Sequence, residues 1–399
     1  MNTFVRSFLL LLSAFPVMAY SFNETDSYLT EELRVRKGLP NFFHKLDTEK
    51  TVRIAYLGGS ITLSEGWRVK SFSWFEEQYP EVNFIQINAA VGGTGADFGV
   101  CRLEEYVLKH QPDLVFVEYR VNGGGDHPNE AFEGVVRRIR EANRGTDICF
   151  VYTIGEWMLP NLLEGKQAYY GVMLEEVANH YGIPSIDFGV EIINLLQADQ
   201  LMMNVNKRPK GKIWFSKDAC HPTDEGHLLY QNTLARSMKK LSIEPKGPYS
   251  HVLPDPLHSK NFNQARYLSV LSAKYSDHWS LVDIENDPIY TDNLFRTNAM
   301  LGDAIQCTEV GGSITFDWEG RFLCMTHIPQ KAGIEVQVSV DGQEPETFTF
   351  EQKSENKLVA RFFYLKEQAP GRHTAKLTVT KLPEGLVYIA GQCLQLCPE

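Results

Sequence analysis

The sequence has no excess of positive charge, no long apolar run after its first twenty residues and few cysteines. The 399 residues carry a formal net charge of −11, whereas broad binding to nucleic acid or anionic lipid needs clustered Lys and Arg. A membrane-spanning helix needs about 20 apolar residues, and no internal segment supplies them. We therefore expect no nucleic-acid partner and no membrane-embedded domain.

Seven cysteines in a chain of this length are too few for a disulfide scaffold. The four in the C-terminal third allow three pairings, among which the sequence does not choose. The odd total leaves at least one thiol free or in an intermolecular bond. We also find no basic stripe, no zinc-type Cys/His array and no glycine-rich phosphate loop that would reverse the expectation of no nucleic-acid partner. The cysteines are Cys101, Cys149, Cys220, Cys307, Cys324, Cys393 and Cys397.

The first residues have the pattern of an export signal. Arg6 precedes a short apolar run at residues 8–15, and residues 17–19 fit the small-x-small rule for cleavage after Ala19. The run is too short for a membrane anchor. We predict that residues 1–19 are a signal peptide and that the mature chain is exported, to the periplasm or the extracellular space.

Apolar runs alternate with helical patterns between about residues 51 and 244. The runs are rich in Val, Ile, Phe and Tyr without strict alternation, which is typical of strands buried on both faces of a parallel sheet. The pattern predicts a three-layer α/β domain. The predicted strands are 52–57, 83–88, 114–119, 148–153 and 184–188, and the predicted helices lie near 67–79, 97–110, 129–143, 167–181 and 224–240.

The pattern changes after residue 244. Prolines and glycines mark residues 245–261 as a linker, and residues 262–399 read as short strands separated by turns. Such regular spacing predicts an all-β sandwich or jelly roll. Residues 20–50 are expected to form a lead-in that packs on the α/β domain.

Ser60 stands in the turn Gly58-Gly59-Ser60-Ile61-Thr62, directly after the first predicted strand. Ligands of open α/β sheets sit at the carboxyl ends of strands, so a hydroxyl there is a candidate nucleophile. Position 62 is Thr, so this is not the G-x-S-x-G elbow of α/β-hydrolases. A purely structural Gly-Gly-Ser turn is the alternative.

A candidate base follows near the last predicted helix, in Asp218-Ala219-Cys220-His221-Pro222. A serine nucleophile needs a base, and the base needs an orienting carboxylate. One turn can place Asp218 beside the His221 imidazole. Thr223 is the expected N-cap of the following helix. The alternative is a surface histidine before a helix, and His227, inside the helix, is expected to have a packing or surface role.

Candidate oxyanion donors follow the second and third predicted strands. Gly93 lies in a glycine-rich turn that lets a backbone N–H approach a substrate, and Asn122 offers a carboxamide. The alternative for each is a purely structural role, Gly93 in a glycine turn and Asn122 in an Asn-Gly turn. Since Ser60, Gly93 and Asn122 each follow a strand, all should meet the Asp218–His221 pair at one edge of the sheet.

In this order, the four blocks resemble those of the SGNH (GDSL-like) hydrolases. Ser60 in GGSIT, Gly93 in NAAVGGTG, Asn122 in VFVEYRVNG and Asp218/His221 in DACHP match the family blocks over about residues 50–240. The resemblance implies a flavodoxin-like sheet over residues 51–244 and ester hydrolysis without metal or cofactor, often of acetyl groups on carbohydrates. Gly123 departs from the family's usual Asn-Asp pair, which puts the neighbouring loop geometry in question.

Export and an appended β domain favour an acylated carbohydrate as substrate. Arg120, Trp67 and Trp157 lie near the predicted active edge, where Trp can stack on a sugar and Arg can pair with an acidic group. The alternative for Trp67 is a place in the hydrophobic core, away from any substrate. A lipase or thioesterase would need a broad apolar acyl pocket. A glycan-binding protein with a decayed hydrolase site stays open because of Gly123 and Arg120.

Overall fold

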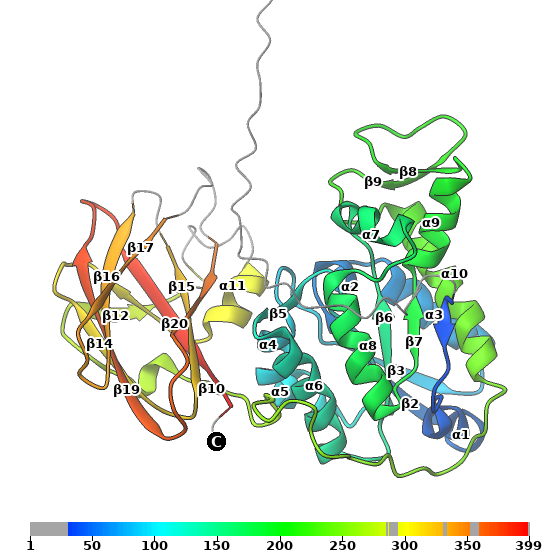
Figure 1. The fold of residues 1–399 in the computed structure, drawn as a ribbon, viewed down its shortest axis with the longest axis horizontal. Coiled ribbons are helices and arrows are strands. Elements are labelled where there is room, and N and C mark those ends of the chain that lie inside the picture. The colour runs from blue at the N-terminus through cyan, green and yellow to red at the C-terminus, as the bar shows by residue number, and fades with distance from the viewer. Residues whose placement is uncertain (1–30, 285, 287–293, 330–332, 352–358, 398–399) are drawn as a thin grey trace, which may run out of the picture.

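The computed structural model describes residues 31–284, 286, 294–329, 333–351 and 359–397. Two regions follow each other along the chain: a sheet flanked by helices, up to about residue 241, and a β-rich region after it (Figure 1). The predicted signal peptide, residues 1–19, lies outside the described residues.

The first region is built on a six-stranded sheet of order β1-β7-β6-β4-β2-β3. The five predicted strands form its parallel part, and β1 adds an antiparallel edge that the sequence did not indicate. The strands are β1 (Leu33–Arg34), β2 (Thr51–Gly58), β3 (Asn83–Asn88), β4 (Leu114–Glu118), β6 (Asp147–Tyr152) and β7 (Ser185–Asp187).

Helices cover both faces of this sheet (Figure 1). α4, α6 and α8 bury Phe98, Val135 and Leu174 on one face, while α1, α3 and α10 bury Phe42, Phe75 and Leu234 on the other. The expected three-layer α/β fold is confirmed. The principal helices are α1 (Pro40–Thr48), α3 (Trp67–Gln78), α4 (Ala96–Cys101), α6 (Pro128–Ala142), α8 (Tyr169–Tyr181), α9 (Gly189–Gln197) and α10 (Asp224–Leu241).

The sequence of α6 shows why such a helix forms and packs. Pro128 begins it, at a position where a missing N–H costs no intrahelical bond. Ala131, Val135 and Ile139 follow at four-residue spacing and are buried, which is the pattern of an amphipathic helix on a core. Its buried Glu133 accepts hydrogen bonds from the backbone N–H groups of Leu257 and His258, at 2.7 Å each. The predicted linker is thereby fixed to the first region.

The second region is a sandwich of two antiparallel sheets, as expected. One has the order β12-β13-β20-β15-β18 with β10 beside β20, and the other has the order β11-β14-β19-β16-β17. A core that includes Phe316 and Val336 lies between them. The strands are β10 (Arg266–Leu268), β11 (Lys274–Tyr275), β12 (Trp279–Val282), β13 (Ala304–Cys307), β14 (Ser313–Glu319), β15 (Phe322–Ile328), β16 (Ile334–Val340), β17 (Glu346–Phe350), β18 (Arg361–Tyr364), β19 (Arg372–Lys381) and β20 (Tyr388–Leu396).

The two sheets of the sandwich differ in burial. β14 alternates buried and more exposed residues, whereas every residue of β15 and β20 is buried. Phe322 and Leu394 belong to the same hydrophobic cluster as Phe98 of α4 and Phe262. The sheet that contains β15 and β20 therefore packs on its partner sheet with one face and on the first region with the other.

Cysteine pairing is settled for six of the seven residues. Cys101, Cys149, Cys220, Cys307, Cys324 and Cys393 form no disulfide, and all but Cys220 are buried. Among the described residues, no helix combines the length and the apolar character that a bilayer crossing requires.

Candidate active site

The candidate residues meet at the carboxyl ends of three adjacent strands. β2 lies between β3 and β4, and Ser60, Gly93 and Asn122 follow β2, β3 and β4 respectively. This is the switch point of the sheet, where successive connections leave to opposite sides and ligands of such folds bind. Ser60 begins the short helix α2 (Ser60–Leu63), with Gly59 as its N-cap.

A chain of hydrogen bonds joins a hydroxyl, an imidazole and a carboxylate. His221 Nδ1 lies 2.8 Å from Asp218 Oδ2, and His221 Nε2 lies 2.8 Å from Ser60 Oγ. An ionised carboxylate only accepts hydrogen bonds, so Nδ1 donates to Asp218. Nε2 of the neutral ring then accepts the Ser60 proton. A serine that attacks a carbonyl with general-base assistance needs this arrangement.

The turn that holds His221 is locally specified. Asp218 Oδ1 accepts the backbone N–H groups of Cys220, at 3.1 Å, and of His221, at 2.8 Å. Ala219 adopts a left-handed φ of +69°, and its carbonyl accepts the Glu156 N–H at 2.8 Å. Partial burial opposes ionisation of Asp218, but the hydrogen bonds from His221 and Cys220 outweigh it and lower its pKa to about 2. Asp218 is therefore ionised at neutral pH.

The second histidine of the segment has the packing role expected for it. His227 is buried in α10, and its Nδ1 accepts the Trp67 backbone N–H at 3.2 Å. Burial is the main reason that its pKa falls to about 4. Thr223 is the N-cap of α10, accepting the Gly226 N–H at 3.4 Å.

The two candidate oxyanion loops lie directly against the serine turn. A Cβ added to Gly92 would lie 3.5 Å from the Ser60 Cβ, and one added to Gly59 would lie 2.0 Å from Asn122 Oδ1. Gly59 is therefore required by the close approach of the Asn122 carboxamide. Asn122 Oδ1 is buried without a hydrogen-bond partner in the described part of the chain. The unpartnered atom is an acceptor, so any donation to an oxyanion would come from the Nδ2 group of the same carboxamide.

The departure at Gly123 has a steric explanation. Gly123 has a φ of +72°, which disfavours any residue with a side chain. A Cβ there would lie 2.4 Å from the Tyr170 ring carbon Cζ. Tyr170 thus fills the space that an aspartate side chain would need, while Asn122 keeps its place beside Gly59.

Sequence reasoning missed Glu118, the last residue of β4. Its buried carboxylate accepts hydrogen bonds from Thr62 Oγ1 at 2.9 Å and Thr153 Oγ1 at 2.5 Å. Desolvation raises the pKa of Glu118 to about 7, although these hydroxyls, the Gly59 N–H and Arg120 oppose the rise. Through these contacts Glu118 holds the turn that carries Ser60. The sequence did contain a signal for this residue, because Glu118 is an acidic residue at the end of an otherwise apolar strand.

Two of the predicted substrate contacts are wrong. Trp67 is fully buried and packs edge-on against Tyr56 and Phe188, with ring centroids 5.5 and 5.6 Å away. Arg120 is also fully buried, and its Nη1 donates to Asp187 Oδ2 at 2.6 Å and Gln167 Oε1 at 2.9 Å. Both side chains face the interior, so neither reaches a substrate.

Trp157 does remain at the surface beside the candidate site. It is 56% exposed and adjoins Glu156, whose N–H binds the Ala219 carbonyl in the His221 turn. A hollow of about 500 Å³ also borders His221, and Trp214 is among the residues that line it. Lys217 Nζ lies 4.8 Å from the centre of the Trp214 ring. Aromatic and charged side chains thus border His221.

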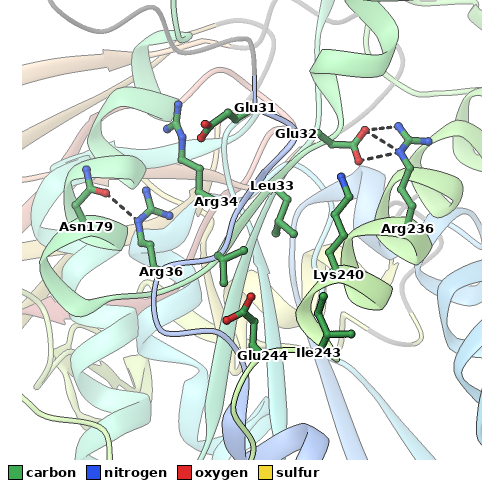
Figure 2. A pocket seen from close by; sticks show the side chains of 11 residues that line it. Glu31, Glu32, Leu33, Arg34, Arg36, Asn179, Arg236, Lys240, Ile243 and Glu244 are labelled. Atoms are coloured by element: carbon green, nitrogen blue, oxygen red, sulfur yellow. Dashed lines mark hydrogen bonds and ion pairs between the residues drawn. The ribbon is translucent and has the colours of Figure 1, made fainter.

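A larger hollow, of about 860 Å³, lies at the β1 edge of the sheet, and no sequence-predicted site residue lines it (Figure 2). Its charges are largely paired within the protein. Arg236 contacts Glu32, and Arg36 donates to Asn179 Oδ1 at 2.8 Å (Figure 2). Arg36 Nη2 also donates to Glu175 at 2.6 Å. These contacts join β1 to α8 and α10, so we assign the hollow no part in the site.

No cluster of three or more His, Cys, Asp or Glu side chains suited to a metal ion occurs in the described ranges. The fold and the hydroxyl–imidazole–carboxylate chain define the class of serine hydrolases. Residues 56–229 match the GDSL-like Lipase/Acylhydrolase family. This part of the chain belongs to that family, and the protein is an ester hydrolase of the SGNH type.

Solved structures share the whole two-region fold. A two-domain esterase active on acetylated mannans superposes with a TM-score of 0.72 at 21% identity, covering 92% of this chain and 97% of that one. A structure of such an esterase co-crystallised with mannopentaose gives a TM-score of 0.70 at 22% identity, covering 89% and 93%. At these identities the likeness establishes the fold alone. No curated protein sequence matches the chain.

Proposed function

We propose that this protein is an exported carbohydrate esterase that removes acetyl groups from a polysaccharide or oligosaccharide of the acetylated-mannan type. The observation that carries the proposal is the hydrogen-bonded chain from Ser60 through His221 to Asp218, open to solvent beside the Gly93 and Asn122 loops. The pattern of residues 1–19 supports export.

In the proposed mechanism, Ser60 Oγ attacks the acetyl carbonyl carbon while His221 Nε2 takes the hydroxyl proton. Asp218 fixes the imidazole tautomer and stabilises the imidazolium. The N–H groups of Ser60 and Gly93 and the Asn122 carboxamide stabilise the oxyanion. His221 then gives its proton to the departing sugar oxygen, leaving an acetyl-enzyme. A water molecule, deprotonated by His221, attacks the acetyl-enzyme to release acetate and restore Ser60.

Two observations support a glycan ester over a lipid ester. The His221 side chain is 45% exposed, so the reacting groups lie at a surface that a polymer can approach. Trp157 and the Trp214 hollow border them, and aromatic rings stack on sugar faces. A lipase would need a broad apolar acyl pocket instead, and the hollow beside His221 is lined largely by charged side chains. The neighbours that act on acetylated mannans add support through their shared fold.

The test is acetate release from acetylated glucomannan and galactomannan, with p-nitrophenyl acetate and p-nitrophenyl octanoate as simple esters. Wild type is expected to release acetate from the glycans and to prefer the acetyl over the octanoyl ester. Ser60→Ala should lower kcat by about 10⁴-fold or more. Ser242→Ala is the matched control, because its hydroxyl lies at the end of α10 and donates to the Lys239 carbonyl at 2.8 Å, away from the reacting groups.

The outcomes separate the candidate functions. A preference for octanoyl esters without glycan deacetylation would favour a lipase. Glycan binding by wild type and Ser60→Ala alike, with no hydrolysis of any ester, would favour a binding protein with an inactive site. Equal activity of Ser60→Ala and Ser242→Ala would remove Ser60 as the nucleophile.

A further inference from the structure

A side chain from the second region reaches the Gly93 loop of the candidate site. Arg296, on α11 (Leu294–Leu301), donates from Nε to the Gly92 carbonyl at 2.9 Å. Its Nη1 donates to the Ala360 carbonyl, next to β18, at 3.1 Å. A Cβ added to Gly93 would lie 3.3 Å from Nε and 3.7 Å from Nη2, so the guanidinium lies directly against the loop. α11 thereby spans from the sandwich to the oxyanion loop.

Fold stability does not account for a charge at this place. Arg296 is 9% exposed, and it forms no ion pair with any carboxylate of the described residues; the cation Arg361 instead acts unfavourably on its charge. Burial lowers the pKa of Arg296 to about 10, which leaves it protonated at neutral pH. A buried charge whose partners among the described residues are neutral carbonyls is costly, and an apolar residue of similar volume is often no less stable.

The carbonyl that Arg296 contacts belongs to the peptide that presents the candidate oxyanion donor. Gly92 C=O and Gly93 N–H share one planar amide. A charge-assisted hydrogen bond to the carbonyl oxygen polarises that amide and fixes its plane, which strengthens the N–H as a donor. Gly92 also faces Ser60, because a Cβ added to Gly92 would lie 3.5 Å from the Ser60 Cβ. A shift of this peptide would therefore be felt at the nucleophile.

We propose that Arg296 is a positioning residue for ester hydrolysis, through which the β-sandwich orients and polarises the Gly92–Gly93 peptide of the oxyanion hole. The inference rests on the proposed function, because it takes Gly93 N–H as an oxyanion donor. It assigns to the second region a role in the chemical step, separate from any role in binding glycan.

The experiment compares Arg296→Met with wild type on p-nitrophenyl acetate, a substrate too small to need a glycan subsite. We expect kcat to fall about 10-fold, less than the effect of losing a whole donor, while KM stays within about twofold. The melting temperature should not fall, because the variant removes a buried charge that no carboxylate of the described residues neutralises. Arg296→Lys, which keeps a cation but only a single-point donor, should recover part of kcat.

Arg138→Met is the matched control. Arg138 Nη1 also joins the two parts of the chain through carbonyls, donating to Val100 O at 3.0 Å and contacting Ala265 O. These contacts involve neither the Gly93 loop nor the Asn122 loop, so the kcat of Arg138→Met should equal that of wild type. If Arg296→Met keeps full kcat, or if both variants lose activity and stability together, Arg296 only docks the two regions and the proposal is overturned.

A second measurement is independent of turnover. In protein labelled with ¹⁵N-glycine, the Gly93 amide resonance should shift between wild type and Arg296→Met, because the hydrogen bond to Gly92 O alters that nitrogen. If wild type hydrolyses no ester, the proposed function fails, but the Gly93 shift still reports the contact. An unchanged Gly93 resonance would overturn the positioning role even in an active enzyme. Should Arg296→Met fail to fold, Arg296→Lys is measured in the same two ways.

Discussion

The two regions of this protein contribute to the candidate site in different ways. The α/β region supplies the reactive groups from short segments, with Asp218 and His221 only three residues apart and Ser60 at the end of one strand. The β-sandwich supplies side chains that contact the Gly93 loop and the helix α4 that follows it. Arg296 is 204 residues from Gly92, and Tyr364, which contacts Asp97 of α4, is 267 residues from it. Local sequence therefore specifies the reactive groups, and contacts between distant parts of the chain hold the surrounding loops in place.

This difference predicts two separable phenotypes. Substitutions of the exposed reactive groups should change rate with little effect on unfolding, because their side chains bury little surface. Substitutions at the contact between the regions should change the unfolding of the whole molecule, because one hydrophobic cluster contains residues of both.

After Ser60→Ala, the largest expected effect is that of Asp218→Asn. An amide in place of the carboxylate presents a donor to His221 Nδ1 and favours the wrong imidazole tautomer. We expect kcat to fall by about 10³–10⁴-fold, with no loss of melting temperature beyond a few degrees, since the side chain is 55% exposed. Ester hydrolysis and thermal unfolding of the same preparations measure both quantities.

Asp224→Asn is the control for that variant. Asp224 lines the same hollow beside His221 but pairs with Lys70 at 2.6 Å. Its kcat should stay within about twofold of wild type, as for a surface substitution away from the reacting groups. An Asp218→Asn enzyme with more than a tenth of wild-type kcat would show that His221 needs no carboxylate here.

The next effect concerns the contact between the regions. Phe322 on β15 is 2% exposed, and its ring centroid lies 4.2 Å from that of His127 and 5.8 Å from that of Phe262. Phe322→Ala should lower the free energy of unfolding by about 3–5 kcal/mol. Because the cluster is shared, calorimetry should show a single transition that shifts as a whole.

Leu281→Ala provides the comparison, since Leu281 on β12 is 64% exposed. Its effect should stay within about 0.5 kcal/mol. Two calorimetric transitions, of which only one responds to Phe322→Ala, would mean that the sandwich and the α/β region unfold independently. The contact between the two regions would then not contribute to the stability of the whole molecule.

Much of the fold was predictable because each element leaves a local pattern. The five parallel strands appear as apolar runs without alternation, and the family blocks identify the hydrolase region. The alternation of β14 was readable in the same way. β15 and β20 are buried on both faces, and only tertiary contacts, with α4, α11 and Phe262, explain this. The edge strand β1 was missed because two residues carry no periodicity.

The site residues show the same limit. Ser60 follows a Gly-Gly turn and His221 follows Asp218 by three residues, and these local features fix where the two side chains lie. The structure brings Ser60 Oγ and His221 Nε2 within 2.8 Å of each other. Trp67 and Arg120 are equally close in sequence to the active edge but face inward. Their orientation depends on distant partners, such as Asp187 for Arg120. Proximity along the chain predicts which edge a residue is near and not which way its side chain points.

The smallest effect expected tests a proton at the contact between the regions. Asp97 is fully buried and contacts the Tyr364 hydroxyl, and desolvation raises its pKa from 3.8 to about 6. The folded protein therefore holds this proton more tightly than the unfolded chain. The stabilisation is complete below pH 4 and is lost as the pH rises through 6, by up to about 3 kcal/mol.

Asp97→Asn removes this titration and keeps an acceptor oxygen for Tyr364. Urea unfolding should give the variant a stability equal to or below that of wild type at pH 4 and above it at pH 8. Tyr364→Phe removes the hydroxyl that hydrogen-bonds the carboxylate, so it should retain the pH-dependent loss of stability. A constant difference between Asp97→Asn and wild type from pH 4 to 8 would mean that Asp97 is ionised throughout. The β-sandwich would then stabilise a charge next to the oxyanion loops, and its contacts would resemble those of Arg296 more than those of a neutral packing surface.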